Sequence, residues 1–110
     1  MLTYVTKQWE DVEMKKLLTA EEARKLAGPS LEEKVESLIE TIKTLAKQKK
    51  RSCRTGYDHK EDEDMWIYGG YDGTEDWQNA KKILKGLGYK VTFYYKVHSV
   101  AVDMYTLIEW

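Results

Sequence analysis

The chain has 110 residues, a length that suits one domain with a single hydrophobic core. Its 18 basic and 19 acidic side chains give a formal net charge of −1, which excludes a strong overall attraction to nucleic acid or to an anionic membrane. The single cysteine, Cys53, excludes an intrachain disulfide, and no apolar run is long enough for a signal peptide or a membrane span, so we expect a cytoplasmic protein.

The N-terminal residues do not fit one type of element. Leu2 and Tyr4 favour a short strand, whereas the position of Trp9 also suits a helix. We therefore interpret residues 1–13 as an N-terminal extension or arm, and residues 14–110 as a single α+β domain.

A short helix is predicted over residues 20–27. Thr19 and Glu22 form a capping-box pattern, in which the two side chains satisfy backbone amides at the start of the helix. Gly28 and Pro29 then end the helix, because proline cannot continue it.

The second predicted helix begins after Ser30, which repeats the capping pattern with Glu33. Its apolar residues recur with the helical period and define one face: Leu31, Val35, Leu38, Ile39, Ile42, Leu45 and Ala46. Acidic residues lie early in this helix and basic residues lie late, which complements the helix dipole.

The middle of the chain changes to an alternating pattern that predicts a strand over residues 52–57. Residues 58–64 are almost all charged and are predicted to form an exposed loop. Residues 65–68 suit either a short strand or a packed loop, and the pairs Gly69–Gly70 and Asp72–Gly73 are typical of turns.

The third helix begins at Thr74 and places Trp77, Ala80, Ile83, Leu84 and Leu87 on one face before Gly88 ends it. Two alternating segments follow, 89–97 and 100–110, joined by a turn at His98–Ser99. We expect these segments to form an antiparallel hairpin.

The element order α-α-β-α-β-β predicts a two-layer α+β fold, with about three helices packed on one face of a three- to four-stranded mixed sheet. The strand at 52–57, the third helix and the strand at 89–97 form a candidate right-handed βαβ crossover. The predicted core comprises Leu26, Leu31, Val35, Leu38, Ile39, Ile42, Leu45, Ile83, Leu84, Leu87, Val91, Phe93, Val102 and Ile108.

The leading candidate site joins the acidic loop to the aromatic, glycine-flanked segment after it. Tyrosine and tryptophan are enriched in contact surfaces, and carboxylates attract a basic partner. The predicted partner-binding residues are Asp58, Glu61, Asp62, Glu63, Asp64, Trp66, Tyr68 and Tyr71. Alternatives are a solvated loop, a divalent metal site including His59, and closure of the core by Trp66 or Tyr68.

A basic cluster offers a nucleic-acid-binding alternative, since lysine and arginine neutralise phosphates and a tyrosine can stack on a base. It comprises Lys47, Lys49, Lys50, Arg51, Arg54 and Tyr57. The competing interpretation is a solvated helix end, favoured by the balanced net charge.

The sequence contains no catalytic constellation, nucleotide-binding loop or metal-ligand spacing, so we expect no enzyme, no cofactor and no metal. Cys53 is interpreted as a small core residue rather than a nucleophile. The oligomeric state stays open.

Three short strings resemble small accessory proteins of tailed bacteriophages: Leu18–Arg24, Leu87–Val91 and the terminal Ile108–Trp110. Together with the layout of the elements, the resemblance covers about residues 14–110. It implies action inside an infected bacterium and brings no catalytic residues. With the candidate surface, it leads us to expect a non-catalytic module that inhibits or redirects a host or defence protein.

Overall fold

A computed structural model describes residues 17–110, so the predicted arm at residues 1–13 lies outside the described residues. The elements follow one another in the order α2 (Ala20–Ala27), α3 (Leu31–Lys47), β1 (Ser52–Arg54), the π-helix η1 (Asp64–Tyr68), α4 (Gly69–Asp72), α5 (Glu75–Gly86), β2 (Lys90–Val97) and β3 (Val102–Glu109). The predicted α+β class is confirmed. No helix in the described part of the chain is long and apolar enough to cross a membrane.

The sheet is antiparallel throughout, with the strand order β1-β3-β2. β3 pairs with β2 from Val102 opposite Val97 to Glu109 opposite Lys90, and its other edge pairs with β1. The prediction of a mixed sheet is therefore wrong. β1 and β2 do run in the same direction, but the C-terminal strand lies between them, because a hairpin strand has a second edge free to accept another strand.

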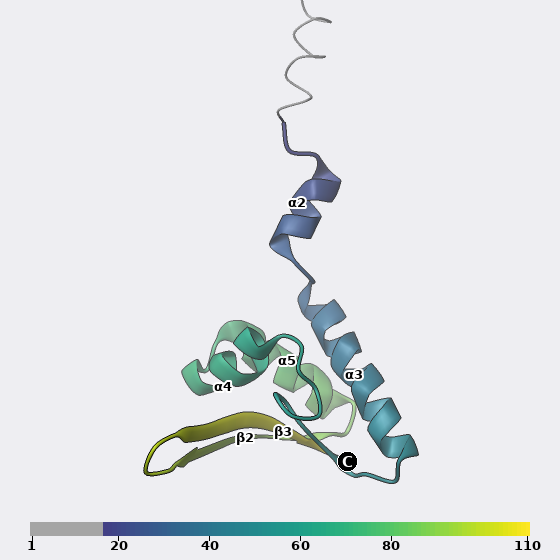
Figure 1. Ribbon diagram of the computed structural model, residues 1–110. Coiled ribbons are helices and arrows are strands. Elements are labelled where there is room, and N and C mark those ends of the chain that lie inside the picture. Colours follow the sequence, from purple (N-terminus) through teal and green to yellow (C-terminus); the bar gives the residue numbers. More distant parts are fainter. Residues whose placement is uncertain (1–16) are drawn as a thin grey trace, which may run out of the picture.

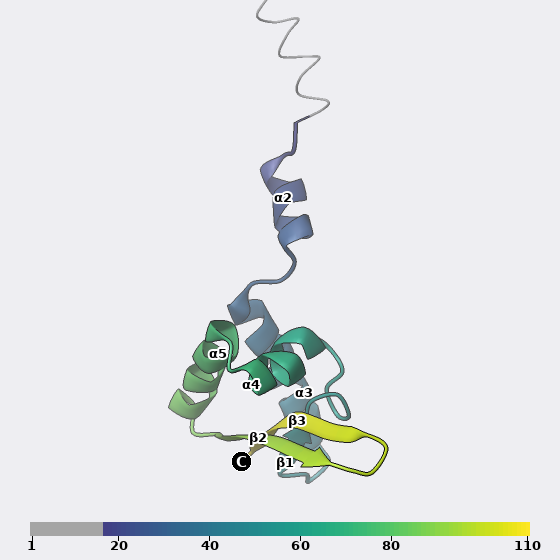
Figure 2. The same ribbon diagram turned by 90° about the vertical axis from the view of Figure 1, so that its left-hand side faces the viewer.

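α3, α4 and α5 lie on one face of the sheet, and the opposite face is open (Figures 1 and 2). α3 contacts α5 and β1, α5 contacts β2, and the η1–α4 segment lies over β2 and β3. The buried core between the layers includes Leu38, Trp66, Ala80, Leu84 and Ile108, none of which has measurable exposed surface.

The first predicted helix forms but does not join this core. α2 has no buried residue and points away from the rest of the molecule (Figure 1). Leu26 is 78% exposed, so its assignment to the core is wrong. The capping box at Thr19 and Glu22 is present, which shows that local hydrogen bonds suffice to define the ends of α2 without tertiary packing.

Three other predicted core residues are exposed: Ile83, Leu87 and Val102. Ile83 and Leu87 lie at the margin of the stripe of α5 that faces the sheet, and periodicity alone does not fix the width of that stripe. Four more predicted core residues, Leu31, Ile39, Phe93 and Val91, pack at or against the core as expected.

The segment after the acidic loop is helical, not a strand or an irregular loop. Met65 and Trp66 of η1 are buried, and α4 continues directly from η1 through Gly69 and Gly70. A Cβ at Gly70 would lie 2.6 Å from the Phe93 ring, so this glycine allows a close approach to β2 rather than forming a turn. A Cβ at Gly69 would lie 2.9 Å from Oγ1 of Thr74, so that glycine allows a close approach to the start of α5. The predicted turn at Gly73 is correct, because this residue has φ +67° and ends α4.

β1 is shorter than predicted, since it ends at Arg54 instead of residue 57. Gly56 has φ +84°, and the amide of Arg54 donates to Oδ2 of Asp58 at 2.9 Å. This local turn removes the following residues from the strand.

A hydroxyl-centred network connects the sheet to η1. Thr106 of β3 is fully buried, and its Oγ1 accepts a hydrogen bond from Nε1 of Trp77 at 2.9 Å. The same hydroxyl donates to the backbone carbonyl of Trp66. The Thr106 amide in turn donates to Oγ1 of Thr55 at 2.9 Å. The Thr106 hydroxyl thereby connects β3 to α5 and to η1, since each buried polar group needs a partner.

Candidate partner-binding surface

The predicted partner-binding residues separate into internal and surface groups. Asp58 is half-buried, accepts the Arg54 amide and lies 3.8 Å from the Arg54 Nε. Glu61 accepts a hydrogen bond from the Ser37 hydroxyl of α3. These two carboxylates therefore hold the loop in place, whereas Glu63 and Asp64 are exposed and free to meet a partner.

His59 contradicts the prediction that residues 58–64 form a wholly exposed loop. Its ring is only 3% exposed, and Nδ1 lies 2.8 Å from Oγ1 of Thr41 on α3. Burial lowers the pKa of His59, because it disfavours the charged imidazolium; the nearby carboxylates of Glu61 and Asp62 oppose this effect.

The prediction that Trp66 contacts a partner is wrong, because the helices and β3 enclose this residue completely. Its indole closes the core, which is the alternative that the sequence left open. Tyr68 and Tyr71 are 53% and 58% exposed. They lie three residues apart in consecutive helical turns, so their side chains are neighbours on the outside of η1 and α4.

The β2–β3 hairpin adds apolar surface that the sequence did not assign to a site. Along the helix-facing side of β2, Val91 and Phe93 pack against the core, whereas Tyr95 and Val97 are 47% and 63% exposed. Val102, opposite Val97 on β3, is 48% exposed. The hairpin thus extends beyond the helices, which cover only the start of β2 and the end of β3. The alternation of residues alone did not reveal this difference in length.

Tyr71 joins the helical and hairpin parts of this surface. Its ring stacks on Tyr95 with centroids 5.4 Å apart and an interplanar angle of 28°. We use the term aromatic–acidic surface for the exposed residues that run from the end of the acidic loop across α4 to the hairpin: Glu63, Asp64, Tyr68, Tyr71, Asp72, Tyr95, Val97 and Val102.

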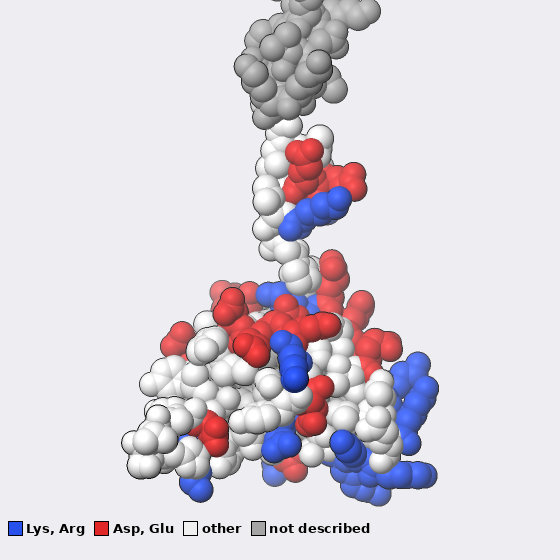
Figure 3. Space-filling view, in the orientation of Figure 1, with Lys and Arg blue, Asp and Glu red and all other residues white. Residues whose placement is uncertain are grey.

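Charges are separated along the molecule (Figure 3). Acidic side chains gather over the upper part of the body, near α4 and the start of α3, and basic side chains gather at the end of α3. The uncharged hairpin end projects at the left of this view. On this face, a molecule with nearly zero net charge therefore gathers acidic and basic side chains in different places.

The structure divides the predicted basic cluster. Lys49, Lys50 and Arg51 line a shallow hollow together with Trp110 and Ala46. Lys49 has φ +67°, which turns the chain between α3 and β1 and brings these cations together. Lys47 is exposed on the last turn of α3, without a described ion pair. Arg54 and Tyr57 lie elsewhere, because residue 54 points to the opposite side of β1 from the buried Cys53.

Tyrosines cover the open face of the sheet beside Arg54. The Arg54 guanidinium lies 4.9 Å from the ring centre of Tyr57, which contacts Tyr105 edge-on. Tyr94 stacks on Tyr105 with centroids 4.7 Å apart. The carboxylate of Asp103 raises the pKa of the exposed Tyr57 hydroxyl, because a second negative charge nearby is unfavourable. The tyrosine rings are thus largely engaged with one another.

Cys53 is a buried core residue, as predicted. Burial, with a smaller effect from Asp58, raises the pKa of its thiol to about 12. A thiol with this pKa stays protonated at neutral pH and is a poor nucleophile.

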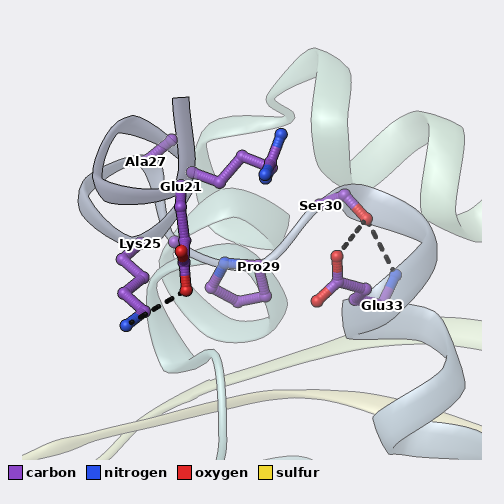
Figure 4. A pocket seen from close by; sticks show the side chains of 8 residues that line it. Glu21, Lys25, Ala27, Pro29, Ser30 and Glu33 are labelled. Atoms are coloured by element: carbon purple, nitrogen blue, oxygen red, sulfur yellow. Dashed lines mark hydrogen bonds and ion pairs between the residues drawn. The ribbon is translucent and has the colours of Figure 1, made fainter. Parts of the chain in front are cut away.

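A hollow lies at the α2–α3 junction (Figure 4). Lys25 lies 3.7 Å from Glu21, and the Ser30 hydroxyl bonds to Glu33. These two pairs are local contacts within α2 and at the start of α3, and they bind the acidic side chains that line the hollow.

No protein-family model matches this chain, and no match is found among curated proteins or solved structures.

Proposed function

We propose that this chain is a non-catalytic protein-binding module whose partner binds the aromatic–acidic surface. The observation that carries the proposal is the uncovered apolar side of the hairpin, where Tyr95, Val97 and Val102 remain exposed next to Tyr71. Contiguous apolar surface of this kind is typical of interaction sites, because its burial by a partner releases water.

The composition of the surface suits a protein partner. Tyr68, Tyr71 and Tyr95 each combine a large apolar ring with a hydroxyl that can hydrogen-bond at the edge of an interface. They project from short helices and a paired strand, so little conformational entropy is lost when they become buried. The exposed carboxylates of Glu63 and Asp64 would accelerate encounter with a basic surface and fix its orientation.

Site-specific photocrosslinking tests this proposal directly. We would place a photoreactive phenylalanine analogue at Tyr95, and as a matched control at Thr92, which is exposed on the opposite face of the same strand. The expected result is a crosslinked partner from Tyr95 and none from Thr92. Equal crosslinking from both positions would contradict an interface on the helix-facing side.

A double variant, Tyr71→Ser with Tyr95→Ser, then measures the contribution of the aromatic pair. Its affinity for the crosslinked partner should fall by at least about tenfold, because central aromatic residues dominate such interfaces. Unchanged far-UV circular dichroism would show that the fold is intact. Affinity within twofold of the parent chain in a folded variant would exclude this surface.

The narrower proposal is that the chain is a phage accessory protein that inhibits or redirects a host or defence protein in the bacterial cytoplasm. It depends on the resemblance of the short sequence strings, and the aromatic–acidic surface is its proposed contact site. Crosslinking in a bacterial lysate, followed by mass spectrometry, would identify the partner. Activity of that partner, measured with and without the chain, then distinguishes inhibition from simple binding.

Nucleic-acid binding is a second candidate, favoured by the hollow at the end of α3. Lys49, Lys50 and Arg51 converge there beside the half-buried indole of Trp110. Cations beside an aromatic ring can bind a phosphate and stack on the adjoining base.

Fluorescence polarisation with a labelled single-stranded oligonucleotide tests this alternative. Reversing the charges of Lys50 and Arg51 to Glu should abolish binding and its steep salt dependence. The control reverses Lys82 and Lys85 on α5, which changes the net charge equally at a different place. Identical effects of the two double variants would indicate only nonspecific electrostatic attraction.

A further inference from the structure

His59, Glu61 and Asp62 form a cluster with the geometry of a metal-ligand set. One ring nitrogen of His59 and one carboxylate oxygen from each of the two acids lie within 4.8 Å of one another. A metal ion bound at about 2.0–2.2 Å from nitrogen and oxygen ligands would need only small side-chain movements to reach all three. Glu61 is exposed and Asp62 half-buried, so an ion has access from solvent, while His59 lies on the protein side.

The hydrogen bonds around His59 fit the tautomer that binds a metal through Nε2. The Thr41 hydroxyl donates its only hydrogen to the backbone carbonyl of Ser37, at 3.4 Å. Oγ1 of Thr41 also lies 2.8 Å from Nδ1 of His59. In the tautomer that binds metals through Nε2, Nδ1 carries the proton and donates to this oxygen. Nε2 is then an unprotonated acceptor.

This acceptor has no protein partner among the described residues. His59 is only 3% exposed, and its Nε2 atom is buried without a hydrogen bond. An unpaired buried lone pair is unfavourable, because it has lost its bond to water. The neutral imidazole with one N–H bonded to the protein and the other nitrogen free is the form in which histidine binds metals.

The two hydroxyls of α3 support the cluster in the way that outer-shell groups support metal ligands. Thr41 holds the ring of His59, and Ser37, one turn earlier on α3, donates to the carboxylate of Glu61. Such hydrogen bonds orient ligand atoms and reduce the freedom that binding would otherwise remove. The rigid α3 thus positions two of the three candidate ligands.

We propose that His59, Glu61 and Asp62 bind a divalent transition-metal ion, with Zn²⁺ the best fit. One imidazole and two carboxylates form a three-ligand set that leaves a position for water or for a partner's side chain. Ca²⁺ and Mg²⁺ fit poorly, because they prefer ligand sets made of oxygen. The site is separate from the tyrosines of the aromatic–acidic surface, and it replaces the expectation that this loop is merely solvated.

Isothermal titration calorimetry with ZnCl₂ and with CaCl₂ tests the proposal on the full chain. Glu61→Gln and Asp62→Asn should each weaken Zn²⁺ binding by at least about tenfold. Asparagine also tolerates the positive φ of residue 62, which is +56°, so this variant should fold. The matched control is Glu63→Gln, which removes the same charge from a neighbouring exposed position and should change affinity less than twofold.

Nitrogen NMR of the imidazole rings supplies a second readout that does not depend on affinity. The metal-free protein should show His59 protonated at Nδ1, and Zn²⁺ should shift its Nε2 resonance while His98 stays unchanged. Absence of Zn²⁺ binding below millimolar concentration, Ca²⁺ binding as tight as Zn²⁺ binding, or Zn²⁺ affinity unchanged in both ligand variants would each overturn the proposal.

Discussion

Replacing Thr106 by valine is the sharpest test of the buried network, because valine keeps the shape of threonine and removes its hydroxyl. Two groups lose their partner in Thr106→Val: the indole N–H of Trp77 and the backbone carbonyl of Trp66. Both lie in the buried layer between helices and sheet. At about 1–3 kcal/mol for each of the two buried groups left unpaired, the free energy of unfolding should fall by about 2–6 kcal/mol.

Urea unfolding followed by far-UV circular dichroism measures this loss. The variant Thr106→Ser separates hydrogen bonding from packing, since it keeps the hydroxyl and should lose only about 1 kcal/mol for the missing methyl group. Thr92→Val is the surface control, because Thr92 is exposed on the open face of the sheet. Its unfolding free energy should change by less than about 0.5 kcal/mol.

A loss below about 1 kcal/mol in Thr106→Val would refute the reasoning, because it would mean that neither group depends on this hydroxyl. A larger loss in Thr106→Ser than in Thr106→Val would refute it as well. That order would assign the effect to the methyl group instead of the hydrogen bonds.

The remaining predictions concern the core, a close approach and the thiol. Leu38→Ala should lower the free energy of unfolding by about 2–5 kcal/mol, whereas Leu26→Ala should change it by less than about 0.5 kcal/mol; equal losses in urea melts would contradict the exposure of α2. Gly70→Ala should destabilise by about 1–3 kcal/mol, because its Cβ would clash with a phenyl ring of β2 at 2.6 Å. Gly86→Ala, with nothing near its Cβ, should stabilise by up to about 1 kcal/mol, and a thermal melt of both glycine variants checks the contrast. Burial raises the pKa of Cys53 from 9.0 to about 12, so the unfolded chain loses this proton first and stability should fall as the pH rises above 9.0. Between pH 9 and 10 the parent chain should lose about 1 kcal/mol more than Cys53→Ala, and parallel pH profiles would count against this pKa.

The candidate site was only partly predictable, and the reason is visible in Trp66, Tyr68 and Tyr71. All three lie in one glycine-flanked aromatic segment, and composition cannot distinguish those that face the core from those that face solvent. The π-helical turn at Asp64–Tyr68 sets that choice, because it rotates Trp66 inward and leaves the tyrosines outside. The exposure of Tyr95 and Val97 was unpredictable for another reason. Apolar and polar residues alternate in the same way whether helices cover the whole strand or only its first half.

Local patterns in the sequence were sufficient to identify most helices and strands of this protein. Capping residues defined the starts of α2, α3 and α5, and glycines defined the ends of α2 and α5. Alternating residues defined the hairpin, because strand faces, like helix ends, depend on residues close in the chain. The positions of these helices and strands relative to one another became known only from the fold. The insertion of β3 between β1 and β2 and the burial of His59 against Thr41 each depend on contacts between distant residues, and α2 lies apart because it buries no residue in such contacts. Such contacts arise from the packing of whole surfaces, and no local pattern in the chain specifies which surface meets which.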